Sequence, residues 1–175
     1  DADDQAGHAN GGGHTMQLYG ETVPLLDELD TFFDLALRRG DATCIIASEE
    51  MRDGLASRLR ARGWDVGRDG GHRRYRAVDA VESLNRFMHN GRLDLALLAP
   101  MAAEMDAYRR VESQSASSRL TIFGNMAWHL LADGNVEGAM ALERAWHELT
   151  HHLPFFTVCG YPTSCFSDGV PNVWS

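Results

Sequence analysis

The chain of 175 residues is long enough to form one domain with a hydrophobic core of its own. Its net charge of −9 argues against nucleic-acid binding by this segment, because phosphate recognition needs a concentrated basic surface. Three cysteines are too few for a disulfide framework, and no apolar run reaches the roughly 18 residues that a membrane span needs, so a cytoplasmic protein is expected.

The composition divides the chain into three parts. Residues 1–13 are polar, acidic and rich in glycine, so they bury too little apolar surface to offset the entropy of ordering and are predicted to form a flexible tail. Residues 14–162 carry the periodic apolar patterns of one folded domain. Residues 163–175 show no periodicity and are predicted to form an irregular extension or a linker.

Between residues 15 and 112, short apolar runs alternate with patterns of helical period. Strands are predicted at residues 15–19, 41–47, 64–67 and 75–78. Three helices are predicted to begin at residues that can cap a first turn, Thr22, Ser48 and Asp79, and to end at the glycines Gly40, Gly63 and Gly91. A fourth helix is predicted across residues 97–108, with a kink or restart at Pro100.

The pattern of residues 119–161 predicts a strand, two helices and a second strand. The flanking apolar runs, RLTIFG at 119–124 and FFTVCGY at 155–161, suit buried strands of a covered sheet. Gly134 ends the first helix, and the Asn135 side chain can cap the second. The second helix then has an apolar face, which is formed by Ala139, Leu142, Trp146 and Leu149.

This alternation predicts an α/β fold with a mainly parallel sheet covered by helices on both faces. In such sheets ligands bind near the carboxyl ends of the strands, so the residues that follow the strands are candidates for a site. No phosphate-loop sequence G-x-x-x-x-G-K-[ST] is present, and no G-x-G-x-x-G follows a predicted strand. The sequence therefore argues against nucleotide hydrolysis and dinucleotide binding.

Residues 147–151, HELTH, match the H-E-x-x-H pattern of zinc metalloproteases. On a helix this spacing places His147 and His151 on one face, with Glu148 available as a general base. No later glutamate can supply a third ligand, and Pro154 stands where one class of these enzymes has glycine. The remaining candidates for a third ligand are Asp168, Cys159 and Cys165. A zinc hydrolase, or a metal bound by His147 and His151 alone, is an alternative to a solvated polar helix face.

Several short motifs follow one another along residues 14–162. They are His14 with QLY at 17–19, GD at 40–41, LRARG at 59–63, DA at 79–80 with Leu84, Phe87 and Met88, FGNM at 123–126, LERAW at 142–146 and VCGYP at 158–162. In this order they resemble the MEDS domain, the methanogen/methylotroph DcmR sensory domain. The family usually has FGEM where this chain has FGNM, so Asn125 lacks the carboxylate that proton transfer or cation binding at that position would need.

The resemblance implies a RecA/KaiC-like fold without a phosphate loop and a noncatalytic sensory role, as in two-component systems or transcription regulators. We therefore expect a small, largely apolar ligand, no cofactor, and signalling to a kinase or regulator partner. The resemblance and the strand ends together indicate six ligand-contacting residues: His14, Tyr19, Met126, Glu143, Trp146 and Tyr161. A protein-interaction module without a small ligand, forming a homodimer through the helix at 93–112, is a further alternative.

Overall fold

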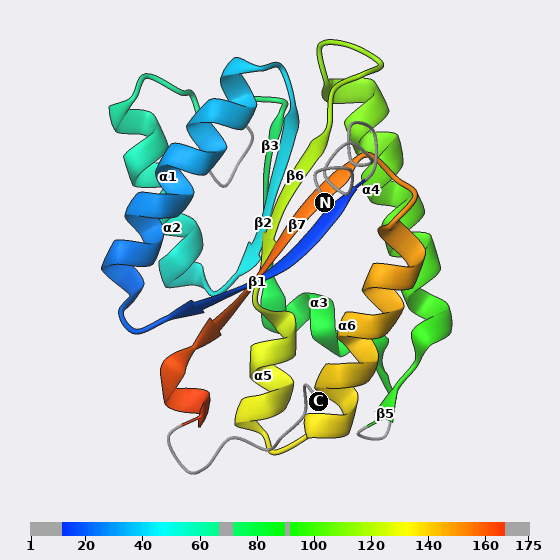
Figure 1. The fold of residues 1–175 in the computed structure, drawn as a ribbon. Coiled ribbons are helices and arrows are strands. Elements are labelled where there is room, and N and C mark those ends of the chain that lie inside the picture. Colours follow the sequence, from blue (N-terminus) through cyan, green and yellow to red (C-terminus); the bar gives the residue numbers. More distant parts are fainter. Residues whose placement is uncertain (1–11, 67–71, 90–91, 167–175) are drawn as a thin grey trace, which may run out of the picture.

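Five parallel strands form one sheet in the computed structural model, which describes residues 12–66, 72–89 and 92–166 (Figure 1). The strands are β1 (Gly13–Tyr19), β2 (Ala42–Ala47), β3 (Tyr75–Asp79), β6 (Leu120–Gly124) and β7 (Phe155–Pro162). Their order across the sheet is β1-β7-β6-β2-β3, and each neighbouring pair is parallel. The predicted mainly parallel sheet is confirmed.

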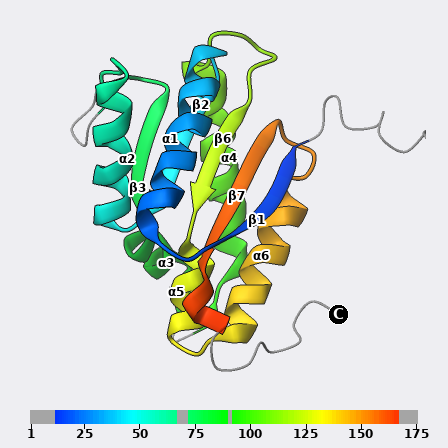
Figure 2. The same cartoon turned by 60° about the vertical axis from the view of Figure 1, so that its left-hand side comes forward.

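Helices cover both faces of this sheet, as the alternating pattern predicted (Figures 1 and 2). One face is covered by α1 (Thr22–Arg38) and α2 (Glu49–Ala61). The other face is covered by α3 (Ala80–Phe87), α4 (Leu98–Glu112), α5 (Met126–Ala132) and α6 (Val136–Thr150). Within the described ranges, no helix has both the length and the apolar character needed to cross a membrane.

Alternation along the buried strands divides the core between the two faces. All six residues of β2 are buried, and Ile45 packs with the α1–α2 layer whereas Cys44 and Ile46 pack with α4 and α6. The same alternation places Phe123 under α1 and α2, and Ile122 on the opposite side. The described residues therefore form one hydrophobic cluster under α1 and α2 and two clusters on the side of α3–α6.

Several helices begin or end at the residues predicted to cap them. Asp79 Oδ1 accepts a hydrogen bond from the Glu82 N–H at 2.9 Å, and Asn135 Oδ1 accepts one from the Gly138 N–H at 2.9 Å. Gly134 has a φ of 75°, the left-handed conformation that terminates a helix. Thr22, in contrast, lies inside the first turn of α1, because the N-cap position is Glu21.

Four local predictions need correction. The helix predicted to end at Gly91 ends at Phe87, because Met88 already opens the strand Met88–His89. Residues 64–66 form no strand, because the Val66 N–H donates to the Trp64 carbonyl oxygen in a tight turn; residue 67 lies outside the described ranges. Pro100 causes no restart, because α4 begins only two residues before it and the N–H groups of a first turn have no acceptor within the helix. The tail predicted at 1–13 ends earlier, since Gly13 opens β1, and residues 1–11 lie outside the description.

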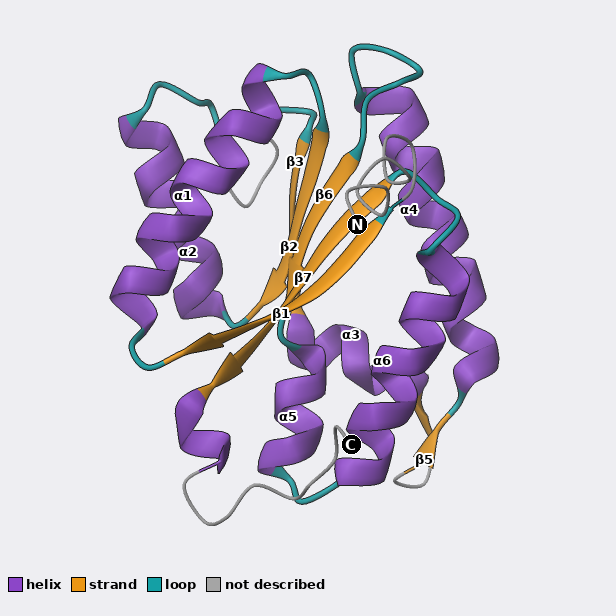
Figure 3. Cartoon of the chain, in the orientation of Figure 1, coloured by secondary structure: helices purple, strands orange, loops and turns teal. Residues whose placement is uncertain are grey.

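Some short elements escaped prediction (Figure 3). Strands β4 (Met88–His89) and β5 (Arg92–Leu93) form an antiparallel pair, and 3₁₀ helices span Leu95–Leu97 (η1) and Thr163–Phe166 (η2). Elements of two to four residues are too short to establish a hydrophobic period, which needs a longer window. Of the predicted extension at 163–175, η2 is described and residues 167–175 are not.

Candidate functional site

A cluster of polar side chains lies between the sheet and α6, with Glu143 buried and His14 and Cys159 half-buried. His14 comes from β1, Glu143 from α6 and Cys159 from β7. The Nε2 atom of His14 lies 2.9 Å from Glu143 Oε2 and 3.2 Å from Cys159 Sγ. The register of the parallel β1–β7 pair places His14 opposite Thr157, so that Cys159 follows on the same face two residues later. Residues 145 positions apart in the chain thus come into contact.

Tyr161 completes the cluster by donating its hydroxyl hydrogen to Glu143 Oε1. The other carboxylate oxygen, Oε2, is close to His14 but has no aligned hydrogen-bond donor among the described residues. Burial acts to raise the pKa of Glu143, but the interactions with His14 and Tyr161 outweigh burial and lower that pKa below its usual value. Glu143 is therefore a buried carboxylate that stays ionised at neutral pH.

The pKa values of Cys159 and Tyr161 are raised, whereas that of Glu143 is lowered. Burial, followed by the negative charge of Glu143, raises the pKa of the Cys159 thiol well above its usual value. The same two causes, in the same order, raise the pKa of Tyr161. Both groups therefore stay protonated at neutral pH, and only the carboxylate of Glu143 is acidic enough to carry a negative charge.

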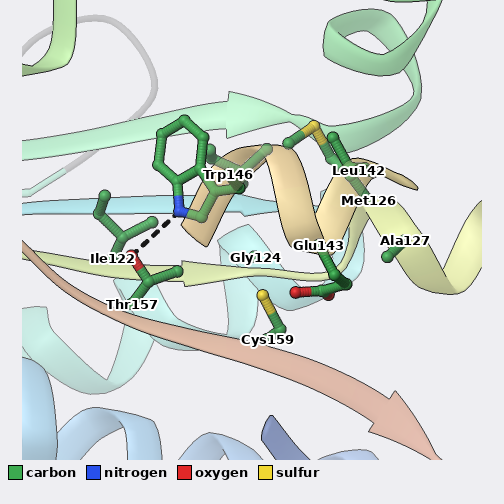
Figure 4. A pocket seen from close by; sticks show the side chains of 10 residues that line it. Ile122, Gly124, Met126, Ala127, Leu142, Glu143, Trp146, Thr157 and Cys159 are labelled. Carbon is green, nitrogen blue, oxygen red and sulfur yellow. Dashed lines mark hydrogen bonds between the residues drawn. The ribbon is translucent and has the colours of Figure 1, made fainter. Parts of the chain in front are cut away.

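A small apolar cavity of about 30 Å³ adjoins the cluster (Figure 4). Its walls come from the sheet and from the helices α5 and α6; they are formed by Ile46, Ile122, Gly124, Met126, Ala127, Leu142, Glu143, Trp146, Thr157 and Cys159. The indole Nε1 of Trp146 donates to Thr157 Oγ1 at 3.2 Å, which satisfies the one polar atom of the ring. Figure 4 shows the Glu143 carboxylate and the Cys159 sulfur beside each other at one side of this space.

Five of the six predicted ligand-contacting residues meet here. Met126, Glu143 and Trp146 line the cavity, and His14 and Tyr161 contact Glu143. Tyr19 does not join them, because it is five positions from His14 on the same strand and therefore lies on the opposite face, packed against the α1–α2 core. Its pKa is raised by burial.

Cys159 and Thr157 were not among the six residues predicted to contact a ligand, and Cys159 was considered only as a third metal ligand for His147 and His151. Both carry a signal in the sequence, because residues 157, 159 and 161 alternate along one strand and must share a face with Tyr161. The carboxyl edge of the sheet contributes less than predicted, since His14 is the second residue of β1 and Cys159 lies in the middle of β7. The site extends along the face of the sheet instead.

Asn125, which replaces the family glutamate, lies outside the cavity. Its Nδ2 donates to Met51 Sδ at 3.5 Å, which directs the side chain towards α2, and its Oδ1 has no described partner. The carboxylate present in this cluster is that of Glu143, on the other face of the sheet.

The HELTH residues are on the outside of α6. His147, Glu148 and His151 are exposed, and the rings of the two histidines stack with their centroids 6.0 Å apart. In the described part of the chain, the only group of three or more metal-binding side chains with converging donor atoms is His14, Glu143 and Cys159. A third ligand for His147 and His151 is therefore not found there; Asp168 lies outside the described residues.

Comparison with known protein families finds a match for this chain. A family model described as MEDS, the methanogen/methylotroph DcmR sensory domain, matches residues 13–172 of the 175-residue chain. No curated protein and no solved structure matches it significantly, and the RecA/KaiC-like relationship therefore stays a prediction. Since the match covers nearly the whole chain and includes every motif that carried the resemblance, this protein belongs to the MEDS family of sensory domains.

Proposed function

We propose that this domain is a noncatalytic receptor for a small, largely apolar ligand, and that it signals to a kinase or transcription-regulator partner. The observation that carries the proposal is the apolar cavity between the sheet and α5–α6, with the Glu143–Cys159 cluster at its side. A ligand with an apolar body and one polar end matches these walls. The membership of a sensory family supports the same function.

The size of the cavity limits this ligand. A volume of about 30 Å³ exceeds the roughly 10–15 Å³ that one water needs, but it is far below the about 150 Å³ of an engineered cavity that binds benzene. A molecule of a few heavy atoms fits the cavity as it stands. A larger ligand requires α5 to move away from the sheet.

The position of the cavity supports a signalling route. Met126 and Ala127 of α5 form one wall, while Leu142, Glu143 and Trp146 of α6 form another. A ligand can bias the packing of two helices only if it contacts them differently in the two states, and this cavity touches both. The α5–α6 pair is therefore the element that we expect to report occupancy to a partner.

The chemistry of the cluster favours binding over catalysis. A nucleophilic cysteine needs a lowered pKa, whereas burial raises the pKa of Cys159. Glu143 is ionised and hydrogen-bonded to Tyr161, which suits recognition of a donor group on a ligand.

A cavity-filling variant tests the proposal. A Cβ added at Gly124 would meet its nearest atom, the Ile46 carbonyl oxygen, at 3.9 Å, so Gly124→Ala introduces a methyl group without a clash. We expect the alcohols from ethanol to butanol, used as probes, to raise the melting temperature of the wild-type protein because they bind only the folded state. Gly124→Ala is expected to abolish this increase.

Gly20→Ala provides the matched control, because a Cβ at Gly20 meets nothing closer than Thr163 Oγ1 at 3.9 Å and lies outside the cavity. This variant should respond to the alcohols as the wild type does. An equal response in folded Gly124→Ala protein would place the binding elsewhere and refute the cavity as the receptor site.

A further inference from the structure

We propose that His14, Glu143 and Cys159 bind a zinc ion, with a fourth coordination position that faces the apolar cavity. Three separate elements, β1, α6 and β7, supply one nitrogen, one oxygen and one sulfur donor. The three donor atoms lie within 4.8 Å of one another. Imidazole, carboxylate and thiolate are the three kinds of protein ligand that zinc takes.

The distances between the three donor atoms are slightly shorter than in a zinc site, as expected when no ion holds the atoms apart. Tetrahedral zinc, with bonds of about 2.0 Å to nitrogen or oxygen and about 2.3 Å to sulfur, separates nitrogen from sulfur by about 3.5 Å and nitrogen from oxygen by about 3.3 Å. The corresponding distances here are 3.2 Å from His14 Nε2 to Cys159 Sγ and 2.9 Å from His14 Nε2 to Glu143 Oε2. Small side-chain rotations are enough to admit the ion.

The charges balance when zinc binds. The Sγ–H bond of Cys159 breaks, the proton leaves to solvent, and an Sγ–Zn bond forms. The thiolate and the Glu143 carboxylate then supply two negative charges against the two positive charges of the ion, with neutral His14 as the third ligand. A buried site without net charge avoids the large cost of an isolated ion in an apolar core.

Neighbouring groups hold the ligands in position. Tyr161 occupies Glu143 Oε1, which leaves Oε2, the oxygen without an aligned donor, free to coordinate. The His14 ring stacks on His147 with centroids 5.8 Å apart and planes inclined by 24°. Outer contacts of this kind fix ligand orientation in metal sites, and their loss typically lowers metal affinity by about 10–100-fold.

Three protein ligands leave one position of a tetrahedron unfilled, as in zinc sites that bind a water or a substrate. Glu143 and Cys159 line the cavity directly (Figure 4), so an ion held between them is within reach of a ligand there. The helix with the HELTH motif would thus contribute Glu143, one turn earlier, while His147 and His151 stay exposed.

The test measures metal binding by the untagged protein after removal of metal with a chelator. We expect one zinc ion per chain by elemental mass spectrometry, and a sulfur-to-cobalt charge-transfer band when Co²⁺ replaces zinc. His14→Gln, Glu143→Gln and Cys159→Ser should each lower zinc affinity more than the about 10–100-fold typical of an outer contact, and Tyr161→Phe should lower it by about tenfold. Circular dichroism verifies that each variant is folded.

Matched controls use the same residue types outside the cluster. Cys165→Ser, Glu148→Gln and His151→Gln should keep zinc and the cobalt band. The proposal is overturned if the wild type binds no zinc, if Cys159→Ser keeps the cobalt band, or if His151→Gln, which affects only the HELTH motif, is the variant that loses the ion. Gly124→Ala should keep zinc, so the zinc result and the alcohol response are decided independently.

Discussion

The Glu143 carboxylate lies in an apolar layer, where an ionised group is stable only if hydrogen bonds replace its water. Tyr161 provides such a bond to Oε1, and His14 lies beside Oε2. Tyr161 is 4% exposed and Glu143 is 9% exposed, so water cannot replace the hydrogen bond between them. Tyr161 is therefore part of the polar cluster as well as of the hydrophobic core.

Replacing Tyr161 with phenylalanine should therefore cost stability. Glu143 Oε1 loses its donor while remaining buried, and a hydrogen bond to a charged group contributes about 1.5–3 kcal/mol. We expect the free energy of unfolding of Tyr161→Phe to fall by about that amount in urea titrations followed by circular dichroism. Tyr75 provides a contrast, because its buried hydroxyl has no described partner. Tyr75→Phe should be neutral or slightly stabilising, and similar losses in both variants would contradict this account.

At the scale of elements, α1, α2 and the turn after α2 are joined by ion pairs around Asp34. The carboxylate of Asp34 accepts from Arg38 Nε at 3.0 Å and from Trp64 Nε1 at 2.8 Å, and Arg62 lies at 3.5 Å. The hydrogen bond from Arg38 is the largest cause that lowers the pKa of Asp34. The folded state therefore favours the charged form of this aspartate.

This shift predicts a stability that depends on acidic pH. A carboxyl group whose pKa is lower in the folded state contributes its stabilisation above the unfolded pKa of about 3.9 and loses it as the pH falls through the folded pKa. Asp34→Asn should thus be less stable than the wild type at pH 7, by about 1–2 kcal/mol because Arg38 is 60% exposed and solvent weakens the pair. The difference should shrink in urea titrations performed from about pH 5 downwards.

Asp27 is the control for this prediction. It is also on α1 and pairs with Arg58 of α2 at 2.8 Å, but it is 66% exposed. Exposed pairs contribute about 0–1 kcal/mol, so Asp27→Asn should change stability little at any pH. A stability difference for Asp34→Asn that stays constant between neutral and acidic pH would refute the assigned pKa shift.

The helices and strands were largely predictable from the sequence, whereas the order in which the strands pair in the sheet was not. Apolar runs and capping residues indicated β2, β6 and β7 within one or two residues, because burial of both faces leaves a strong pattern. The pairing of β1 with β7 depends on contacts between residues far apart in sequence, and no local pattern contains that information. Cys159 was therefore not assigned to the site, although its alternation with Tyr161 was visible.

Tyr19 illustrates the opposite error. It follows a strand, as ligand-binding residues of α/β proteins often do, but a residue at an odd distance from His14 on the same strand cannot share its face. The alternation rule alone was enough to separate the two. The strand ends indicated where in the fold a site was expected. The face of the sheet on which each side chain lies then determined which residues could contact one another.

For the molecule as a whole, β1 joins the beginning of the described chain to its end. It is an edge strand, paired within the sheet only to β7, and His14 adds a side-chain contact to α6 and β7. Met16 and Leu18 lie on the same face of β1 as His14 and are 46% and 57% exposed, so these two side chains bury little apolar surface to hold β1 in place. The His14 contacts are therefore expected to stabilise β1 more than they would a central strand.

Native-state hydrogen exchange can test this dependence. His14→Ala removes the contacts with Glu143 and Cys159, and a loss of about 0.5–1.5 kcal/mol corresponds to a roughly 2–10-fold faster local opening. The amides of β1 should exchange faster by that factor, while those of the central strands β2 and β6 change little. Gln17→Ala, which removes an exposed contact from the same strand to Glu28, should leave β1 nearly unaffected. If exchange instead accelerated equally in β1, β2 and β6, then β1 would open only with the whole sheet, and His14 would stabilise the domain globally rather than anchoring its edge.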